Sequence, residues 1–541
     1  MKLRILFFYF SFVAVASVIT VAVFAGVSMR PGDVLQMTQK QNATLPAGAA
    51  LSSGEKHVAT EMQKNDVPAC MNDMRCPDCN VILLSVDSLR ADHVGAYGYE
   101  RDATPFFDEI AKNGVLFENF FSSSFLTPVS EMAVHTGMYP SATMVTNFDT
   151  VLPEDRMTIA QHFKQNGYAT SALLSSPEFD INPALRESFS RGFEQYEYIK
   201  REPPISLNDF RAFPGDTQIE AEMKKIADKK FFWWVGIGGV HWPYRKQEQN
   251  VFADANYTGI FKDAPLTWAE FQNVYEGVDH HNKMPLSDAD IQYVQDHYDN
   301  GVRAFDGFLE RFINELKQQN LFDSTLIVIQ SEHGEDLHEH GYFAHYDILD
   351  TQTHVPLMII SPRFERGCRI TSFAGSVDIF PTILEMTEHE QLSQFQGKSL
   401  APIISGDEGD GARQEVFLER NPLWEETETV KIGFEARGII IGEERHNDIG
   451  IRTPQWKYID RMSNATMKEI SWWQMISGKQ LYFPEAELYD LVNDPMETKN
   501  VVDQYPKQAA MLRKKLQIWF SWVTATSKSR VDKRPVMQPY F

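Results

Sequence analysis

Four short apolar runs constrain the fold of this chain more than any other feature of its sequence. They cover residues 80–87, 231–240, 325–330 and 355–360. Near-continuous apolar strands are typical of a parallel sheet that is covered on both faces. Between the runs lie helical patterns, such as residues 289–316, in which apolar residues recur at spacings of three and four. This alternation predicts an α/β fold with a doubly wound, mainly parallel sheet flanked by helices.

Acidic and imidazole side chains stand at the ends of three of these runs. Asp87 ends the first run, His241 follows the second, and Glu332 and His333 follow the third. Any one of them alone is most simply a cap or turn residue. In doubly wound folds, however, ligands gather outside the carboxyl ends of the strands. Because Asp, Glu and His together suit a divalent cation, the four residues indicate a metal site at this edge.

Three more histidines follow the third run, namely His338, His340 and His345. For any single one, a solvated surface position is the simpler interpretation. As a group they indicate a site lined with hydrogen-bond donors for an anion.

The composition excludes several classes of function. Of the 541 residues, 43% are hydrophobic, which suffices for a large core, and 51 basic against 74 acidic residues give a net charge of −23. The chain therefore lacks the basic footprint of a nucleic-acid binder and of a polybasic membrane-surface protein. Four cysteines are too few for a scaffold built from disulfides.

The N-terminal segment predicts export. Lys2 and Arg4 precede an uncharged, mostly apolar stretch at residues 5–29, which is long enough to cross a hydrocarbon core of ~30 Å. The stretch is either a membrane anchor or a signal peptide cleaved near residues 23–25. The basic residues ahead of it place the rest of the chain outside the cytoplasm, whether anchored or secreted.

A cysteine cluster ends the segment that follows. Cys70, Cys76 and Cys79 lie near its end, and Cys368 is far away in sequence. A structural zinc site normally needs a fourth Cys or His close by. One or two disulfides are therefore the favoured interpretation in an exported protein, their pairing left open, and a redox-active CxxC is the alternative.

An ordered series of motifs runs from about residue 80 to residue 522. Its members are Val-Asp-Ser-Leu-Arg-Ala-Asp at 86–92, Thr-Pro-Val-Ser at 127–130 with Thr-Gly-Met-Tyr-Pro at 136–140, His-Trp-Pro-Tyr at 241–244, Ser-Glu-His-Gly-Glu at 331–335 and Glu-Leu-Tyr-Asp at 487–490. Each motif is weak alone, but their order and spacing together resemble the sulfatase branch of the alkaline phosphatase superfamily. The resemblance implies an enzyme that acts on anionic esters with the help of a metal ion.

The resemblance also implies a domain organisation. Its sheet would be completed by a small C-terminal α+β subdomain. The expected parts are an anchor or signal peptide at 1–30, a flexible tether at 31–79, a sulfatase-like catalytic domain at 80–400 and the C-terminal subdomain at 401–541.

The resemblance implies one metal site built from Asp87, Thr127, Glu332 and His333. Four ligands that include an imidazole favour Zn²⁺ or Mn²⁺. Ca²⁺, the ion expected by analogy with sulfatases, prefers six to eight oxygens, and Mg²⁺ is a further alternative. Glu332 stands where the family usually has Asp, which leaves the metal preference open.

The position of the nucleophile departs from the sulfatase pattern. Sulfatases carry a Cys or Ser that is converted to formylglycine, followed four residues later by Arg. This chain has Thr127 and Glu131 at those positions, and Thr cannot give the aldehyde. A Thr here resembles the phosphoethanolamine and phosphoglycerol transferases and the nucleotide phosphodiesterases, which use it as both nucleophile and metal ligand.

Thr127, His241 and His345 are accordingly the expected catalytic residues. The two histidines would hold the oxygens of the substrate, together with Ser130, and one of them would protonate the leaving oxygen. The competing interpretation of Thr127 is a helix N-cap with Pro at the next position, in which case Ser130 is the fallback nucleophile.

Several functions fit this reading of the sequence. The favoured one is an exported, metal-dependent hydrolase of phosphate or phosphonate esters that uses Thr127. The alternatives are a sulfuric ester hydrolase without formylglycine, a phosphoethanolamine- or phosphoglycerol-type transferase, and a catalytically silent metal-binding protein.

Overall fold

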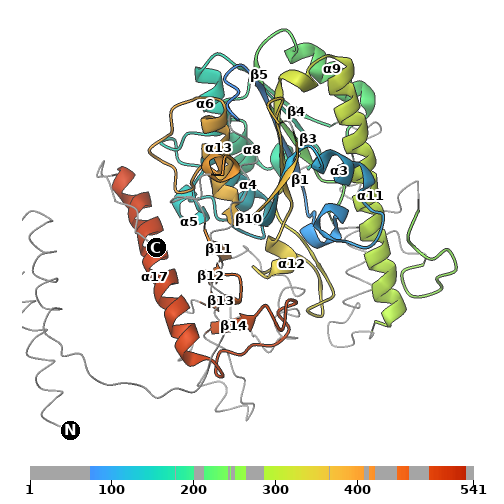
Figure 1. Cartoon of the computed structure of the whole chain (residues 1–541), viewed down its shortest axis with the longest axis vertical. Coiled ribbons are helices and arrows are strands. Elements are labelled where there is room, and N and C mark those ends of the chain that lie inside the picture. Colours follow the sequence, from blue (N-terminus) through green and yellow to red (C-terminus); the bar gives the residue numbers. More distant parts are fainter. Residues whose placement is uncertain are drawn as a thin grey trace, which may run out of the picture. The chain divides into compact units, whose positions relative to one another are not determined.

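The computed structural model describes residues 74–176, 178–199, 213–241, 244, 250–262, 286–364, 366–406, 413–420, 448–461 and 486–531. All of them belong to one compact unit, residues 67–541. Eight of the described strands form one sheet (Figure 1), in the order β10 (Cys368–Gly375), β2 (Val115–Phe121), β9 (Leu357–Ile360), β6 (Thr325–Ser331), β1 (Asn80–Val86), β5 (Phe231–Ile237), β3 (Ala169–Leu174) and β4 (Gln195–Tyr198). The predicted α/β class with a mainly parallel sheet is confirmed.

One strand departs from the parallel pattern. The apolar run at 355–360 forms β9, which is antiparallel to both of its neighbours, β2 and β6. The chain between β6 and β9 forms no helix longer than four residues and returns along the same edge of the sheet. A parallel strand would have needed a crossover of a dozen or more residues to the opposite edge.

Both faces of the sheet are covered, because the residues of its central strand point alternately to two cores. Ile82 and Leu84 of β1 pack with helices α3 (Pro105–Ala111), α9 (Asp216–Ile226) and α11 (Asp288–Gln318). Val81 and Leu83 point to the other face. That face is covered by α4 (Thr127–Thr136), α6 (Ile159–Gln165), α7 (Glu178–Ile181), α8 (Pro183–Phe189), α13 (Ile379–Met386) and α14 (Ala401–Ile404).

Helix α11 matches the predicted helix at 289–316 closely. Its N-cap is Ser287, whose side chain accepts a hydrogen bond from the backbone N–H of Asp290, and the Asp290 carboxylate accepts the backbone N–H of Ser287. This reciprocal capping satisfies two of the unpaired donors at the helix start.

A second, antiparallel sheet forms the expected small C-terminal subdomain. Its order is β11 (Val416–Arg420), β12 (Asp448–Arg452), β13 (Trp456–Asp460) and β14 (Ala486–Asp490). Helix α17 (Pro506–Val531) lies beside this sheet (Figure 1). Its residues Leu512, Leu516 and Trp519 share a core with Phe417 and Ile451 of the strands.

The segment between β6 and β9 approaches this second sheet. It contains a short hairpin, β7 (Asp336–Leu337) and β8 (Phe343–Ala344), and the one-turn helix α12 (Asp350–Thr353). Within the described ranges, the remaining short elements are α5 (Pro140–Thr143) and four 3-10 turns, η1 (Ala91–His93), η2 (Gly95–Tyr97), η4 (Phe322–Ser324) and η5 (Ser376–Asp378).

The expectation of disulfides is confirmed. Cys76 is bonded to Cys79 directly before β1, and Cys368 at the start of β10 is also disulfide-bonded. Cys70 lies outside the described residues, as does the apolar stretch at 5–29. Among the helices that the structure describes, none is long and apolar enough to cross a membrane.

Candidate active site

The register of the sheet brings the predicted site residues together. β1 lies between β5 and β6, parallel to both, and Val86 at its end pairs with Ile237 and with Ser331. The residues that follow these strands therefore meet at one edge. Asp87 comes directly after β1 and is fully buried.

Backbone contacts fix this edge. The Ser331 hydroxyl donates to the carbonyl of Val86 at 2.7 Å and accepts the backbone N–H of Leu89 at 3.0 Å. Ser88 has φ = 64°, a left-handed conformation that costs a non-glycine residue roughly 1 kcal/mol or more. Gly334 is required, because a Cβ atom there would lie 2.3 Å from the Thr351 carbonyl oxygen.

Thr127 is the first residue of α4, and its hydroxyl does not cap the helix. The N-cap is Leu126, and no side-chain hydrogen bond caps this end. The Thr127 Oγ1 atom lies 3.0 Å from Nε2 of His333 instead. The N-cap interpretation of Thr127 is therefore wrong, because the hydroxyl is directed across the sheet edge.

His333 presents a nitrogen lone pair to the Thr127 hydroxyl. Its Nδ1 lies 2.9 Å from the carbonyl oxygen of Gly334, which accepts hydrogen bonds only, so Nδ1 carries the proton. In the neutral ring, Nε2 is then the acceptor. It faces the Thr127 hydroxyl and lies 3.5 Å from Oδ1 of Asp87.

His241 and His345 face each other beside Asp87. Their Nε2 atoms are 2.9 Å apart, and Nε2 of His241 is 4.0 Å from Oδ1 of Asp87. His241 is buried and His345 is half-buried, and the rings of His333 and His345 are 4.0 Å apart between centroids. The structure thus brings the two predicted anion-binding histidines next to two of the predicted metal ligands, Asp87 and His333.

Glu335 belongs to this edge and was missed by the sequence reasoning. Ligand atoms of His241, Glu335 and His345 all lie within 4.8 Å of one another, the one such group of three found among the described residues. Glu335 is fully buried. Burial and the neighbouring Glu335 carboxylate raise the pKa of the Tyr244 hydroxyl well above its usual range. The signal was present, because Glu335 closes the same Ser-Glu-His-Gly-Glu motif that supplied Glu332 and His333.

Other predicted residues make different contacts. Glu332 is buried, and its backbone N–H donates to the carbonyl of Val86 at 3.2 Å. The Ser130 hydroxyl donates to the carbonyl of Leu126, one turn back in its own helix. His340 bonds the Asp336 carboxylate and the carbonyl of Met496. His345 is thus the member of the group of three histidines that joins the site.

Glu131, at the position of the family arginine, points into a buried polar network. Its carboxylate accepts a hydrogen bond from Gln330 at 2.9 Å and lies 3.5 Å from Nε2 of His135. Gln330 also donates to Ser85, which accepts from the indole of Trp234. Glu131 therefore contributes to the packing beneath α4.

The donor set fits a divalent cation. Ligands at ~2.1 Å from a cation lie about 3–3.5 Å from each other. Nε2 of His333 lies 3.0 Å from the Thr127 hydroxyl and 3.5 Å from the Asp87 carboxylate, which are such spacings. A buried carboxylate, a hydroxyl and an imidazole lone pair are also the chemical types that such an ion selects.

The comparisons with known proteins agree on one family. The profile of the Sulfatase family matches residues 79–389. Among curated relatives, arylsulfatase K of Xenopus laevis is 22% identical over 76% of this chain and 77% of its own length. Human iduronate 2-sulfatase is 27% identical over 66% and 72% of the two chains.

Solved structures share the fold. A phosphonate monoester hydrolase of Agrobacterium radiobacter superposes with a TM-score of 0.61 at 20% identity, covering 82% of this chain and 96% of that one. A 2-O GAG sulfatase gives a TM-score of 0.59 at 19% identity, covering 85% and 95%. Family members use a metal ion, and the profile match spans more than half of the chain. The chain therefore belongs to the sulfatase family, as an enzyme that acts on ester bonds.

Proposed function

We propose that this protein is an exported, metal-dependent hydrolase of phosphate or phosphonate esters that uses Thr127 as its nucleophile. The observation that carries the proposal is the 3.0 Å contact between Thr127 Oγ1 and His333 Nε2. A threonine at a helix N-cap would normally use its hydroxyl to cap the helix. Thr127 is instead the first helical residue, and its hydroxyl faces His333, whose Nε2 also lies 3.5 Å from the buried Asp87.

The proposed reaction has two steps. In the first, Thr127 Oγ attacks the phosphorus atom, its bond to the leaving oxygen breaks, and the hydroxyl proton passes to a basic group of the site. His241 or His345 holds the oxygens of the anion and protonates the leaving oxygen. In the second step, water attacks the Thr127 ester, which releases the product and restores the hydroxyl. Attack by an acceptor hydroxyl instead of water would make the same site a transferase.

Asp87, Thr127, Glu332 and His333 would hold the cation. When bound, a divalent cation lowers the pKa of a hydroxyl beside it and stabilises negative charge on the transferred group. The donor set, with one imidazole and few oxygens, favours Zn²⁺ or Mn²⁺ over Ca²⁺ or Mg²⁺.

Sulfate-ester hydrolysis is the second candidate, because the curated relatives are sulfatases. A hydrated aldehyde carries two hydroxyls on one carbon. After one of them has taken the sulfate, the other can lose its proton and become the carbonyl again, which breaks the C–O bond to the sulfate and releases it. Thr127 has no such hydroxyl, so a sulfate ester on it would have to be opened by water at sulfur. This difference favours the phosphorus esters.

Export and the division of the chain are part of the proposal. A disulfide at Cys76–Cys79 and a disulfide-bonded Cys368 are typical of an oxidising compartment. Residues 80–400 would form the catalytic domain and 401–541 the subdomain that completes it.

The test compares initial rates on an aryl phosphodiester, a phosphonate monoester, a phosphomonoester and a sulfate ester, with Zn²⁺ or Mn²⁺ supplied. We expect phosphorus-ester turnover that falls at least 10³-fold in Thr127→Ala, with partial activity in Thr127→Ser. Ser130→Ala is the matched control and should keep most of the rate. Turnover that survives Thr127→Ala would reject the proposed nucleophile, and turnover confined to the sulfate ester would establish the second candidate.

A further inference from the structure

The segment that carries His345 lies against the C-terminal sheet, not only against its own sheet. After His345, the backbone N–H groups of Tyr346 and Asp347 both donate to the side-chain carbonyl of Gln352 in α12, at 2.5 and 2.7 Å. The carbonyl of Tyr346 accepts a hydrogen bond from Arg420 of β11 at 2.8 Å. Both residues that follow His345 are therefore held through their backbones.

Arg461, which follows β13, binds this segment through the carboxylate of Asp347. Its two terminal nitrogens bond the two carboxylate oxygens of Asp347, each at 2.8 Å. The same guanidinium contacts Asp448 at 2.9 Å and Glu487 at 2.8 Å. Burial disfavours its charged form, but Asp347, Glu487 and Asp448 outweigh this and raise the pKa of Arg461 well above the usual range.

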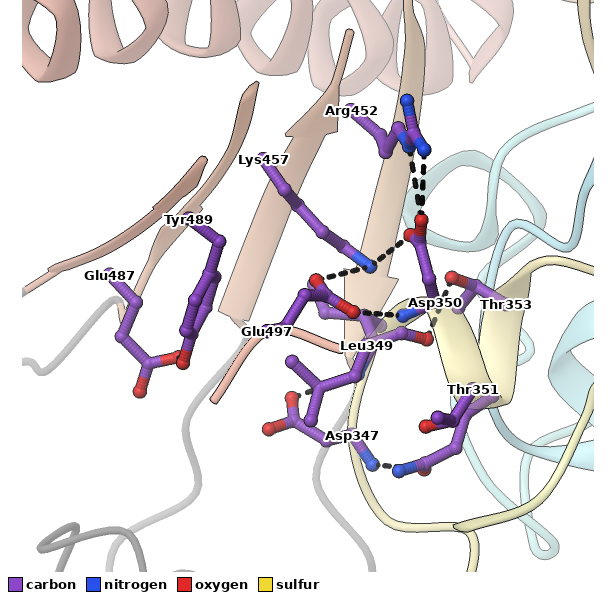
Figure 2. A network of polar contacts seen from close by, with 12 residues as sticks. Asp347, Leu349, Asp350, Thr351, Thr353, Arg452, Lys457, Glu487, Tyr489 and Glu497 are labelled. Carbon is purple, nitrogen blue, oxygen red and sulfur yellow. Dashed lines mark hydrogen bonds and ion pairs between the residues drawn. The ribbon is translucent and has the colours of Figure 1, made fainter. Parts of the chain in front are cut away.

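A second set of ion pairs holds Asp350, three residues after Asp347, at the start of α12 (Figure 2). The Asp350 carboxylate bonds Lys457 at 2.8 Å and Arg452 at 3.0 Å. Lys457 is fully buried and also reaches Glu497 at 3.1 Å, whose carboxylate accepts the backbone N–H of Asp350. Burial alone would raise the pKa of Asp350, yet Arg452 and Lys457 hold it well below the usual range.

We call this set of ion pairs the C-terminal clamp. It consists of three cations of the C-terminal subdomain and two carboxylates of the segment after His345, namely Arg461, Lys457 and Arg452 with Asp347 and Asp350. A bidentate guanidinium–carboxylate pair fixes orientation as well as distance, and Asp347 is two residues from His345. Removing freedom from a group that must meet the substrate is worth large rate factors.

We propose that Arg461 is a positioning residue for His345, so that the C-terminal sheet sets the geometry of the active site through the C-terminal clamp. The inference rests on the proposed role of His345 in binding and protonating the ester. Arg461 itself touches no reacting atom; it acts through Asp347.

A double-mutant cycle tests this proposal. The variants are Arg461→Lys, which keeps the charge but loses the bidentate geometry, His345→Ala, and both together, each measured by kcat/KM on the best ester. We expect losses of about tenfold for Arg461→Lys and about 100-fold for His345→Ala, with the double variant no slower than His345→Ala alone. A residue that merely supports the fold would lower the rate by the same factor in both backgrounds.

The control cycle uses Tyr489→Phe. The Tyr489 hydroxyl bonds Glu487 at 2.9 Å in the same network, and Phe keeps the ring. Its effect should stay below about twofold and should multiply with that of His345→Ala. If Arg461→Lys fails to fold, Asp347→Asn replaces it, because it removes the same ion pair with an isosteric side chain.

The second readout of the same four proteins is the Kd for tungstate, a tetrahedral oxyanion. This measurement requires no turnover. Arg461→Lys should weaken tungstate binding in the wild-type background and leave it unchanged in the His345→Ala background. Equal factors in both backgrounds, or no effect of Arg461→Lys on either readout, would overturn the clamp. A rate that survives Thr127→Ala would reject the proposed nucleophile without changing either cycle, so the two failures are distinguishable.

Discussion

Buried carboxylates gather in two regions of this molecule, and they meet different partners there. In the C-terminal network, which comprises the C-terminal clamp and the acids Asp448, Glu487 and Glu497 beside it, Asp347 and Asp350 face Arg461, Arg452 and Lys457 at 2.8–3.0 Å. At the edge of the large sheet, carboxylates and imidazoles meet instead.

The difference lies in the charge of the partners. Guanidinium and ammonium groups are cations throughout the physiological pH range. A carboxylate paired with one is already neutralised, so the pair has little affinity left for a metal ion or an anionic ligand. A neutral imidazole offers a lone pair and a proton that can move. The first arrangement fixes structure, whereas the second attracts a cation and an anionic substrate. Substitutions of the same chemical kind should therefore act mainly on activity at the sheet edge. Among the C-terminal ion pairs they should act mainly on stability, and on activity only through the Arg461–Asp347 pair that positions His345.

The largest effect is expected for Asp87→Asn. The change removes a charge from the proposed metal site at constant shape, so ester turnover should fall about 10³-fold while the urea midpoint stays the same or rises. Asp448→Asn is the matched control, since Asp448 is equally buried but pairs with Arg461. It should keep turnover within about threefold. The midpoint should change little, because burial raises the pKa of Asp448 despite its arginine partners and Arg461 keeps Asp347 and Glu487. An Asp87→Asn variant that is unstable but active would reverse the comparison.

Removal of divalent cations should act on the sheet edge alone. Dialysis against a chelator should lower turnover at least 100-fold, and readdition of Zn²⁺ or Mn²⁺ at 100 times its Kd should restore the rate and stabilise the fold by about 2.7 kcal/mol. Thermal unfolding with and without metal measures the second effect. In Asp87→Asn the metal-dependent shift should disappear. A shift that persists there would place the cation elsewhere.

In the C-terminal network, Lys457→Met should cost stability. Lys457 has no exposed surface and pairs with Asp350 and Glu497. Its loss leaves the buried Glu497 without a cation and Asp350 with Arg452 alone, at a cost of about 3–5 kcal/mol in the free energy of unfolding. The surface pair Arg369–Glu118, in which half of the arginine side chain is exposed, supplies the control. Arg369→Met should cost less than about 1 kcal/mol by urea denaturation. Equal costs would mean that burial of the network is not what makes it structural.

The sequence predicts the sheet edge better than the loops around it. Asp87, Glu332 and His333 follow strands that run parallel side by side, so the pairing of Val86 with Ser331 brings them together. The direction of β9 was not predictable, because an apolar run does not encode which way its strand runs.

The course of the loop after His333 depends on partners far away in the chain. His340 turns to the carbonyl of Met496, and Asp347 to Arg461, each more than 100 residues away in sequence. No local pattern distinguishes His340 from His345. Similarly, a one-residue change in where α4 begins decides whether Thr127 caps the helix or faces His333. Such differences come from tertiary contacts and are seen only in three dimensions.

The smallest predicted effect concerns Glu419, a buried acid whose contacts are hydroxyl and amide rather than cation. Its carboxylate accepts hydrogen bonds from the hydroxyl and the backbone N–H of Ser141. Burial raises the pKa of Glu419 from its usual value near 4.5 to about 7, although the bonds from Ser141 oppose the shift. The folded protein then holds this proton more tightly than the unfolded chain does.

Stability from this group is therefore full below pH 4.5 and is lost as the pH rises to about 7. Glu419→Gln keeps an acceptor for Ser141 and cannot ionise. Relative to wild type, the variant should gain about 3 kcal/mol at pH 8 and less than about 1 kcal/mol at pH 5. Urea unfolding of both proteins across this pH range measures the difference. A gain that does not depend on pH would show that Glu419 is ionised at no cost, as the clamped carboxylates are.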